Sequence, residues 1–181
     1  MQGAKEDVRL FKAMFGDKEG KARAEILYAR IVAAARDPHW YVAGGVPDTI
    51  DGRFDMIAAL LALVMLRLEA DGGSSRAAVA ALAECFVDDM EGSLRQIGIG
   101  DLVVGKHVGR MMSALGGRLG AFRDALTEGD DLMAPVRRNI FHEAPPSDEA
   151  LHHVVARLGR FRGRLEALPA AELAAGALPE A

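Results

Sequence analysis

Eight residues near the middle of the chain almost form a phosphate-binding loop. Gly100–His107 reads GDLVVGKH, whereas the loop that cradles nucleotide phosphates reads GxxxxGK followed by Ser or Thr. His107 lacks the hydroxyl that would hold magnesium, and residues 86–97 have a helical pattern where the motif requires a buried strand. The sequence therefore disfavours nucleotide binding at this position.

Metal ligands at a suitable spacing are also scarce. Glu149 and His152 form an ExxH pair, but the di-iron bundles that use this spacing need a second copy on a facing helix, and the sequence has none. Cys85 is the only cysteine, so the chain can form neither an internal disulfide nor a cysteine cluster. The other histidines have no ligand-like spacing: His39, His107, His142 and His153. We predict no metal site and no cofactor.

Catalytic arrangements of nucleophile and base are missing from the sequence as well. No nucleophile elbow is present. Paired carboxylates occur at residues 88–89 and 130–131, and on helical proteins such pairs are usually solvated faces or helix caps. We therefore expect a protein that is not an enzyme and acts by binding.

A stripe of small residues indicates where binding could occur. Gly105, Gly109, Ser113, Gly116 and Gly120 are spaced 4, 4, 3 and 4 residues apart, which on a helix makes a band about 80° wide. Each glycine inside a helix costs about 1 kcal/mol relative to alanine, so close approach of another helix must offset the cost. Two interpretations stay open: a helix crossing inside the protein, or a surface groove for a client helix.

The last long helical segment, residues 148–168, is basic and amphipathic. It contains no acidic residue between Glu149 and Glu166. Such a helix either contacts anionic lipid, ribosomal RNA or an acidic partner, or is an ordinary solvated helix. Its arginines are Arg157, Arg160, Arg162 and Arg164.

Length and composition set the frame for these features. The chain has 181 residues, of which 50% are hydrophobic and 27% charged, so a substantial core can form. Its net charge of −4 argues against DNA as a partner. The longest uncharged apolar run, residues 56–66, is shorter than the roughly 20 residues of a membrane span, and the polar N-terminus does not resemble a secretory signal. We expect a cytoplasmic protein, or one peripheral to the inner face of the cytoplasmic membrane.

Strand patterns are nearly absent, which predicts an all-α, single-domain bundle of about five to six helices. We expect a short amphipathic segment within residues 1–20, a helical domain over residues 21–168 and a flexible tail over residues 169–181. The helices are predicted at residues 21–36, 48–69, 75–97, 101–126, 131–142 and 148–168. Residues 56–66 are apolar on all sides of their helix, so this helix should lie at the centre of the bundle.

From about Ala24 to Leu126 the chain resembles the ubiquinol-cytochrome c chaperone family. Several charged and glycine positions recur in the family's order and at its separations. The residues that carry the resemblance are Trp40, Tyr41, residues 46–55 (VPDTIDGRFD), Arg67, Leu68, Asp89, Met90, Leu94, Arg95, residues 98–102 (GIGDL), Gly105 and Lys106.

The resemblance implies an assembly factor without catalytic activity. Such a protein holds newly made cytochrome b near the ribosome exit or the cytoplasmic membrane face until the ubiquinol–cytochrome c reductase (bc1) complex forms. Eukaryotic members work with a smaller partner protein. Among the shared residues, Asp48, Thr49 and Asp51 are expected to cap one helix and Asp101 another.

The shared cations have two possible roles. Arg53, Arg95 and Lys106 either pair with Asp89 or Asp101 to fix helix ends, or face a partner.

These observations combine into one predicted function, a non-catalytic chaperone that binds apolar helical segments of cytochrome b. The predicted partner-binding residues are Gly105, Gly109, Gly116, Gly120, Met111, Met112, Arg53, Arg95 and Lys106, with Met90 and Phe86 as further adaptable side chains. The predicted contacts to membrane or ribosome are Arg157, Arg160 and Arg164. Two alternatives remain: a haem- or lipid-binding bundle with its site between the second and fourth helices, and a homodimer that pairs through the glycine stripe.

Overall fold

The computed structural model describes residues 3–128, 131–142 and 146–181, and this part of the chain is helical without strands. The prediction of an all-α fold is confirmed. The helices are α1 (Gly3–Ala35), α2 (Pro38–Val42), α3 (Ile50–Glu69), α4 (Arg76–Gln96), α5 (Asp101–Glu128), α6 (Met133–Val136), the π-helical turn η1 (Arg137–Phe141), α7 (Asp148–Ala167) and α8 (Ala170–Ala174).

Helix α3 lies at the centre of the bundle, as its apolar sequence predicts. It contacts α1, α4, α5, α7 and α8, and every residue from Met56 to Met65 is buried. The helix begins at Ile50 because the Thr49 hydroxyl accepts a hydrogen bond from the Gly52 amide at 3.1 Å, which confirms Thr49 as its cap. None of the described helices is long and apolar enough to span a bilayer.

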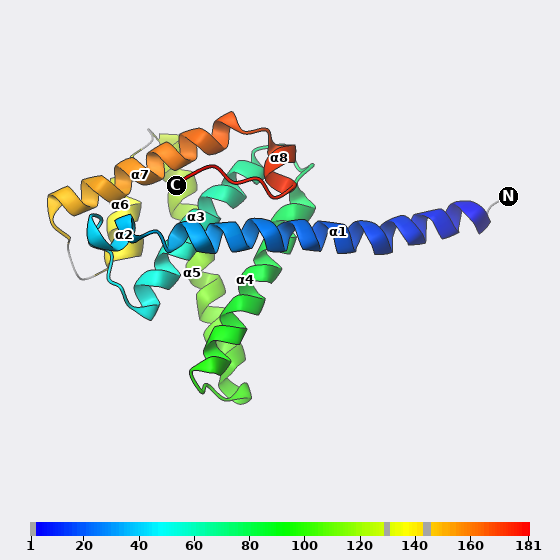
Figure 1. Ribbon diagram of the computed structural model, residues 1–181, viewed down its shortest axis with the longest axis horizontal. Helices are drawn as coiled ribbons and strands as arrows, with labels where there is room; N and C mark the ends of the chain where they lie inside the picture. The colour runs from blue at the N-terminus through cyan, green and yellow to red at the C-terminus, as the bar shows by residue number, and fades with distance from the viewer. Residues whose placement is uncertain (1–2, 129–130, 143–145) are drawn as a thin grey trace.

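The outer helices are fastened to α3 and to each other by a few polar contacts. Figure 1 shows α1 running across the molecule, with α7 on one side of it and the lower ends of α4 and α5 on the other. Arg67 near the end of α3 donates hydrogen bonds to the carbonyls of Leu165 at 3.0 Å and Leu168 at 2.8 Å. The indole of Trp40, fully buried, donates to the Ala34 carbonyl at 2.9 Å.

The two ends of the chain differ from the sequence prediction. Helix α1 runs without interruption from Gly3 to Ala35, whereas the sequence predicts a separate short segment before a helix that starts at residue 21; a single glycine such as Gly16 costs a long helix only about 1 kcal/mol. The side chains of the predicted amphipathic segment lie outside the described residues. At the other end, where we expect a flexible tail, the structure has α8 with Leu173 fully buried. Arg30 of α1 donates to the Gly176 carbonyl at 2.7 Å and holds this segment in place.

Three predicted helix starts have different outcomes. Ser147 caps α7, since its hydroxyl accepts from the Ala150 amide at 3.2 Å. Ser75 occupies the cap position of α4, but its hydroxyl donates to Asp71 and not to the helix. The predicted cap Asp101 has its side chain outside the described residues.

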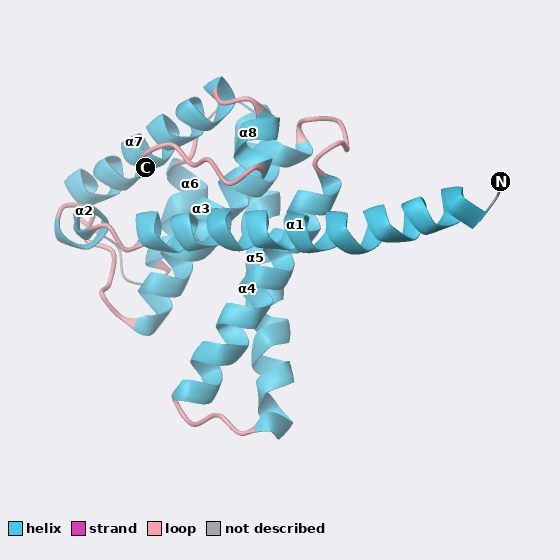
Figure 2. Ribbon diagram, turned by 45° about the vertical axis from the view of Figure 1, so that its right-hand side comes forward, coloured by secondary structure: helices cyan, strands magenta, loops and turns pink. Residues whose placement is uncertain are grey.

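The distal halves of α4 and α5 extend away from the rest of the molecule as a helical hairpin (Figures 1 and 2). We call residues 87–112 the arm and the remainder the body. The arm has its own small cluster of buried side chains, separate from the main core: Leu94, Val104 and Val108, with Val87, Ile99, Met111 and Met112 packed against them.

Candidate functional site

The glycine stripe lies on the surface of α5. Gly105, Gly109 and Gly116 are exposed and Gly120 is half-buried. Among the residues that the structure describes, a Cβ atom built on any of these four glycines would have no neighbour within 4 Å. The interpretation of the stripe as a helix crossing inside the protein is therefore wrong for this chain. The smooth strip of backbone remains open to a partner.

Two flexible sulfur-containing side chains belong to the same helix: at 100° per residue Met112 lies about 60° from the middle of the stripe and Met111 about 160°. Met111 and Met112 are half-buried and pack against both the main core and the arm cluster. Such unbranched side chains can adapt their shape to different apolar surfaces. Met90 and Phe86, predicted as further contacts, are buried, and Phe86 is fully enclosed by the core. Their role in the structure is to support the root of the arm.

The three predicted cations do not gather at one place. Arg53 belongs to the body, where its guanidinium is 2.7 Å from the Asp48 carboxylate and 5.9 Å from the centre of the Tyr41 ring. Arg95 lies in the arm, 3.9 Å from Glu91. Lys106 is exposed on α5, next in sequence to Gly105.

The predicted pairing of these cations with Asp89 is wrong for Arg53. That arginine pairs with Asp48, and Asp89 instead accepts a hydrogen bond from the Tyr28 hydroxyl at 2.8 Å. Burial, with Asp89 acting in the same direction, raises the pKa of Tyr28 well above its usual range. This contact ties α1 to α4 beside the root of the arm.

Helix α7 presents less free positive charge than its sequence indicates. Arg162 is 2.9 Å from Glu166, and Arg164 is 3.6 Å from Glu180. Arg157 is half-buried, whereas Arg160 is exposed.

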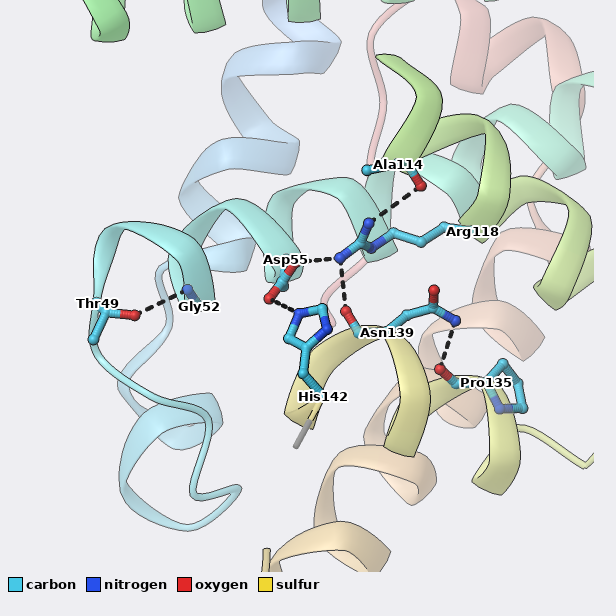
Figure 3. Close-up of polar contacts among 8 residues, drawn as sticks. All are labelled: Thr49, Gly52, Asp55, Ala114, Arg118, Pro135, Asn139 and His142. Atoms are coloured by element: carbon cyan, nitrogen blue, oxygen red, sulfur yellow. Dashed lines mark hydrogen bonds and ion pairs between the residues drawn. The ribbon is translucent and has the colours of Figure 1, made fainter. Parts of the chain in front are cut away.

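A buried ion pair joins α5 to α3 at the root of the arm (Figure 3). The guanidinium of Arg118 contacts the carboxylate of Asp55, and both side chains are 4% exposed. Arg118 also donates to the carbonyls of Asn139 at 2.7 Å and Ala114 at 3.2 Å. The guanidinium carbon of Arg118 also lies over the Phe54 ring, 5.4 Å from the ring centre.

His142 closes the open side of this ion pair. Its Nε2 atom is 2.7 Å from the second carboxylate oxygen of Asp55. Burial raises the pKa of the Asp55 carboxyl, while Arg118 and His142 act in the opposite direction. His142 has a positive φ of 49° with ψ −117°, a backbone conformation that residues other than glycine rarely adopt. Its contact with Asp55 fixes the end of η1 against α3.

Sequence reasoning missed Arg118 and His142, although one signal was available. Arg118 interrupts the inward face of α5 between Leu115 and Phe122, both buried. A charged residue on an apolar face needs a buried partner of opposite charge. Asp55 occupies the same kind of position in α3.

The described pockets do not support a ligand site between α3 and α5. The pocket beside α7, about 470 Å³, lies between the end of α2 and the start of α7, and its lining includes Val42, Ser147 and His153. His153 is 3.2 Å from the ring of His39. No group of acidic, histidine or cysteine side chains that could hold a metal occurs in the described part of the chain.

Comparison with known proteins provides a functional context for this geometry. A family model described as ubiquinol-cytochrome C chaperone matches residues 42–180. The chain is 30% identical to the protein in the crystal structure of the Cbp3 homologue from Brucella abortus, with a TM-score of 0.79 and 96% of each chain covered. No curated protein matches the chain.

Proposed function

The chain belongs to the ubiquinol-cytochrome C chaperone family, and from this premise we propose that it binds apolar helical segments of newly made cytochrome b during assembly of the bc1 complex. Binding would occur without catalysis and without ATP. The client helix would lie along the glycine stripe, with Met111 and Met112 against its side chains. Lys106 and Arg95 would contact polar groups at its end.

The exposure of the glycine stripe is the observation that carries this proposal. Four glycines inside one helix cost several kcal/mol relative to alanine, and the packing of the chain on itself recovers none of that cost at these positions. A smooth helix surface permits a second helix to approach closely, as small-residue stripes do in membrane proteins. A client derived from a membrane protein would supply such a helix.

The basic helix α7 is proposed to keep the chaperone close to the ribosome or the membrane. Arg157, Arg160 and Arg164 would face ribosomal RNA or anionic lipid. The ion pair between Arg164 and Glu180 would open on binding. In this proposal the protein works in the cytoplasm or at the inner face of the cytoplasmic membrane.

Deletion of the gene in its host tests the role in assembly. We expect loss of spectroscopic cytochrome b and of assembled bc1 complex, and recovery of both when the wild-type gene is returned. Unchanged levels after deletion would contradict the proposal.

Substitutions in the stripe test the proposed surface. Gly109→Leu with Gly116→Leu places two side chains in the path of the client, so captured cytochrome b should fall at least about tenfold in pull-downs from the host. Gly20→Leu is the matched control, because Gly20 in α1 is also an exposed helical glycine with no described neighbour within 4 Å of a built Cβ. If the stripe variant and the control captured equal amounts of cytochrome b, the client would not bind at the glycine stripe.

A homodimer is the second candidate function, because the same exposed stripe could pack against its copy. In that case Gly109→Leu would dissociate a dimer in size-exclusion chromatography while client capture stayed intact. The remaining alternative, a haem- or lipid-binding bundle, predicts purified protein that is coloured or carries lipid in mass spectrometry.

A further inference from the structure

The free end of the arm carries apolar side chains that the chain itself does not cover. Ile97 is 58% exposed and Val103 47% exposed. They flank the turn at residues 98–100 that joins α4 to α5, and Figure 2 shows this turn at the end of the hairpin farthest from the body. We call residues 97–103 the tip.

The shape of the tip limits what can cover it. Neighbouring apolar side chains, Leu94 and Ile99, pack inward on the arm cluster, so Ile97 and Val103 are left on the outside of a narrow protrusion. A client helix requires an extended surface, such as the stripe. A narrow protrusion with apolar residues at its end is instead suited to insertion into the interface of a lipid bilayer.

Positive charge lies directly behind the apolar end. Val103, Lys106 and Arg110 are spaced i, i+3 and i+7 along α5, and all three are exposed. This places the cations about 4.5 Å and 10 Å behind Val103 along the helix axis. This separation is comparable to the depth of about 5–10 Å to which apolar faces of interfacial helices enter the boundary between headgroups and acyl chains.

The distal part of the arm differs in charge from its root. Residues 92–112 contain three cations and one acid and sum to +2, whereas residues 87–91 contain three acids and no cation, so the whole arm sums to −1. The four charged residues of the distal part are Arg95, Lys106, Arg110 and Asp101, of which the last has its side chain outside the described residues. The end of the arm, rather than the arm as a whole, is thus suited to an anionic surface.

We propose that the tip inserts into the interface of a lipid bilayer with anionic headgroups. Ile97 and Val103 enter the boundary of the acyl chains, and Lys106 and Arg110 contact lipid phosphates. This contact requires no cytochrome b, so it goes beyond the client-binding proposal and can be tested without it. It is also distinct from a contact through α7.

Sedimentation of the full chain with vesicles tests the contact. We expect binding to vesicles of equal parts phosphatidylcholine and phosphatidylglycerol, weaker binding to phosphatidylcholine alone, and release by added salt. Ile97→Ser with Val103→Ser should reduce partitioning about tenfold. Lys106→Gln with Arg110→Gln should weaken binding and reduce its salt dependence.

Exposed apolar residues elsewhere provide a matched control. Val42 is 85% exposed and Ile50 68% exposed, both in the body. Val42→Ser with Ile50→Ser removes the same chemistry from another surface and should leave vesicle binding unchanged. Loss of binding in this pair as large as in the tip pair would overturn the proposal.

A polarity-sensitive dye locates the inserted residue directly. Attached through Val103→Cys in a Cys85→Ala background, the dye should shift to the blue when phosphatidylglycerol vesicles are added, and the same dye attached through Val42→Cys should not. No shift at the tip would overturn the proposal. The proposal would also be overturned if the double variant Arg160→Gln with Arg164→Gln lost vesicle binding while the tip pair kept it. That result would assign the contact to α7. If the wild-type protein does not bind vesicles but forms a dimer, and the tip pair dissociates that dimer, a second copy of the chain covers the tip and the proposal is wrong.

Discussion

The body and the arm use helices in opposite ways. In the body, α3 is apolar on all sides, and every residue from Met56 to Met65 is buried. In the arm, α5 has one apolar edge, formed by Val104 and Val108, beside a bare strip of glycine. The comparison teaches that the chain completes its own packing around α3, whereas one face of α5 is left uncovered by the described residues.

One buried contact holds these two regions together. Arg118 lies on α5 at the root of the arm, and its partner Asp55 is on the central helix. The direction in which the arm extends therefore depends on an ion pair inside an apolar core. Ion pairs of this kind cost desolvation energy but fix one arrangement when each charge has its partner.

Removing one partner should produce the largest effect. Arg118→Met leaves the Asp55 carboxylate buried with His142 as its remaining polar neighbour, so we expect unfolding free energy to fall by about 3–5 kcal/mol. The measurement is the midpoint of urea unfolding.

The surface pair in the same helix is the control for this variant. Arg123 is 2.6 Å from Glu69, but both side chains are exposed. Arg123→Met should change stability by less than about 1 kcal/mol. Similar losses in the two variants would show that burial does not govern the Arg118 contact.

Truncating leucines separates the two hydrophobic clusters. Leu60 is fully buried in α3, so Leu60→Ala should cost about 2–5 kcal/mol of global stability. Leu94→Ala removes one of the three buried side chains of the small arm cluster and should reduce global stability by less than Leu60→Ala does. Hydrogen exchange should then accelerate in the arm while the body stays protected. Equal acceleration in both regions would mean that arm and body unfold as one unit.

Two glycines give opposite expectations for the same substitution. A Cβ on Gly52 of α3 would collide with the carbonyl oxygen of Pro47, so Gly52→Ala should destabilise the protein. A Cβ on Gly109 meets nothing within 4 Å, so Gly109→Ala should stabilise it by up to about 1 kcal/mol. Thermal unfolding measures both shifts. Destabilisation by Gly109→Ala would show that something inside the chain already covers the stripe.

The sequence predicted the body better than the arm for a physical reason. An apolar run such as residues 56–66 admits only burial on all sides, and the central position of α3 follows from it. The predicted Thr49 cap is a local contact within three residues and is confirmed, and Ser147 caps α7 over the same short distance. The glycine pattern is compatible with an internal helix crossing and with an open surface, and only the three-dimensional arrangement shows that none of the described residues covers the stripe.

Contacts that join distant parts of the chain were beyond the sequence. The ion pair of Asp55 with Arg118 spans 63 positions, and the His142 contact spans 87. A single charge on an apolar face indicates that a partner exists but not which one. The C-terminal segment was misjudged because its alanines indicate little by themselves, whereas Leu173 finds a buried position.

The smallest expected difference concerns pH and belongs to the body alone. Burial lowers the pKa of His39, Arg157 and His153 act in the same direction, and Asp37 opposes them. Below about pH 6.5 the unfolded chain therefore binds a proton that the folded chain resists, so the free energy of unfolding should fall as the pH decreases. The change should be less than about 1 kcal/mol, because the nearby Asp37 carboxylate opposes part of the shift. His39→Gln should flatten the dependence of the urea midpoint between about pH 7.5 and 5.5. If the urea midpoint of the variant decreased as much as that of the wild type, other groups would cause the effect. The contact between His39 of α2 and His153 of α7 would then be insensitive to pH.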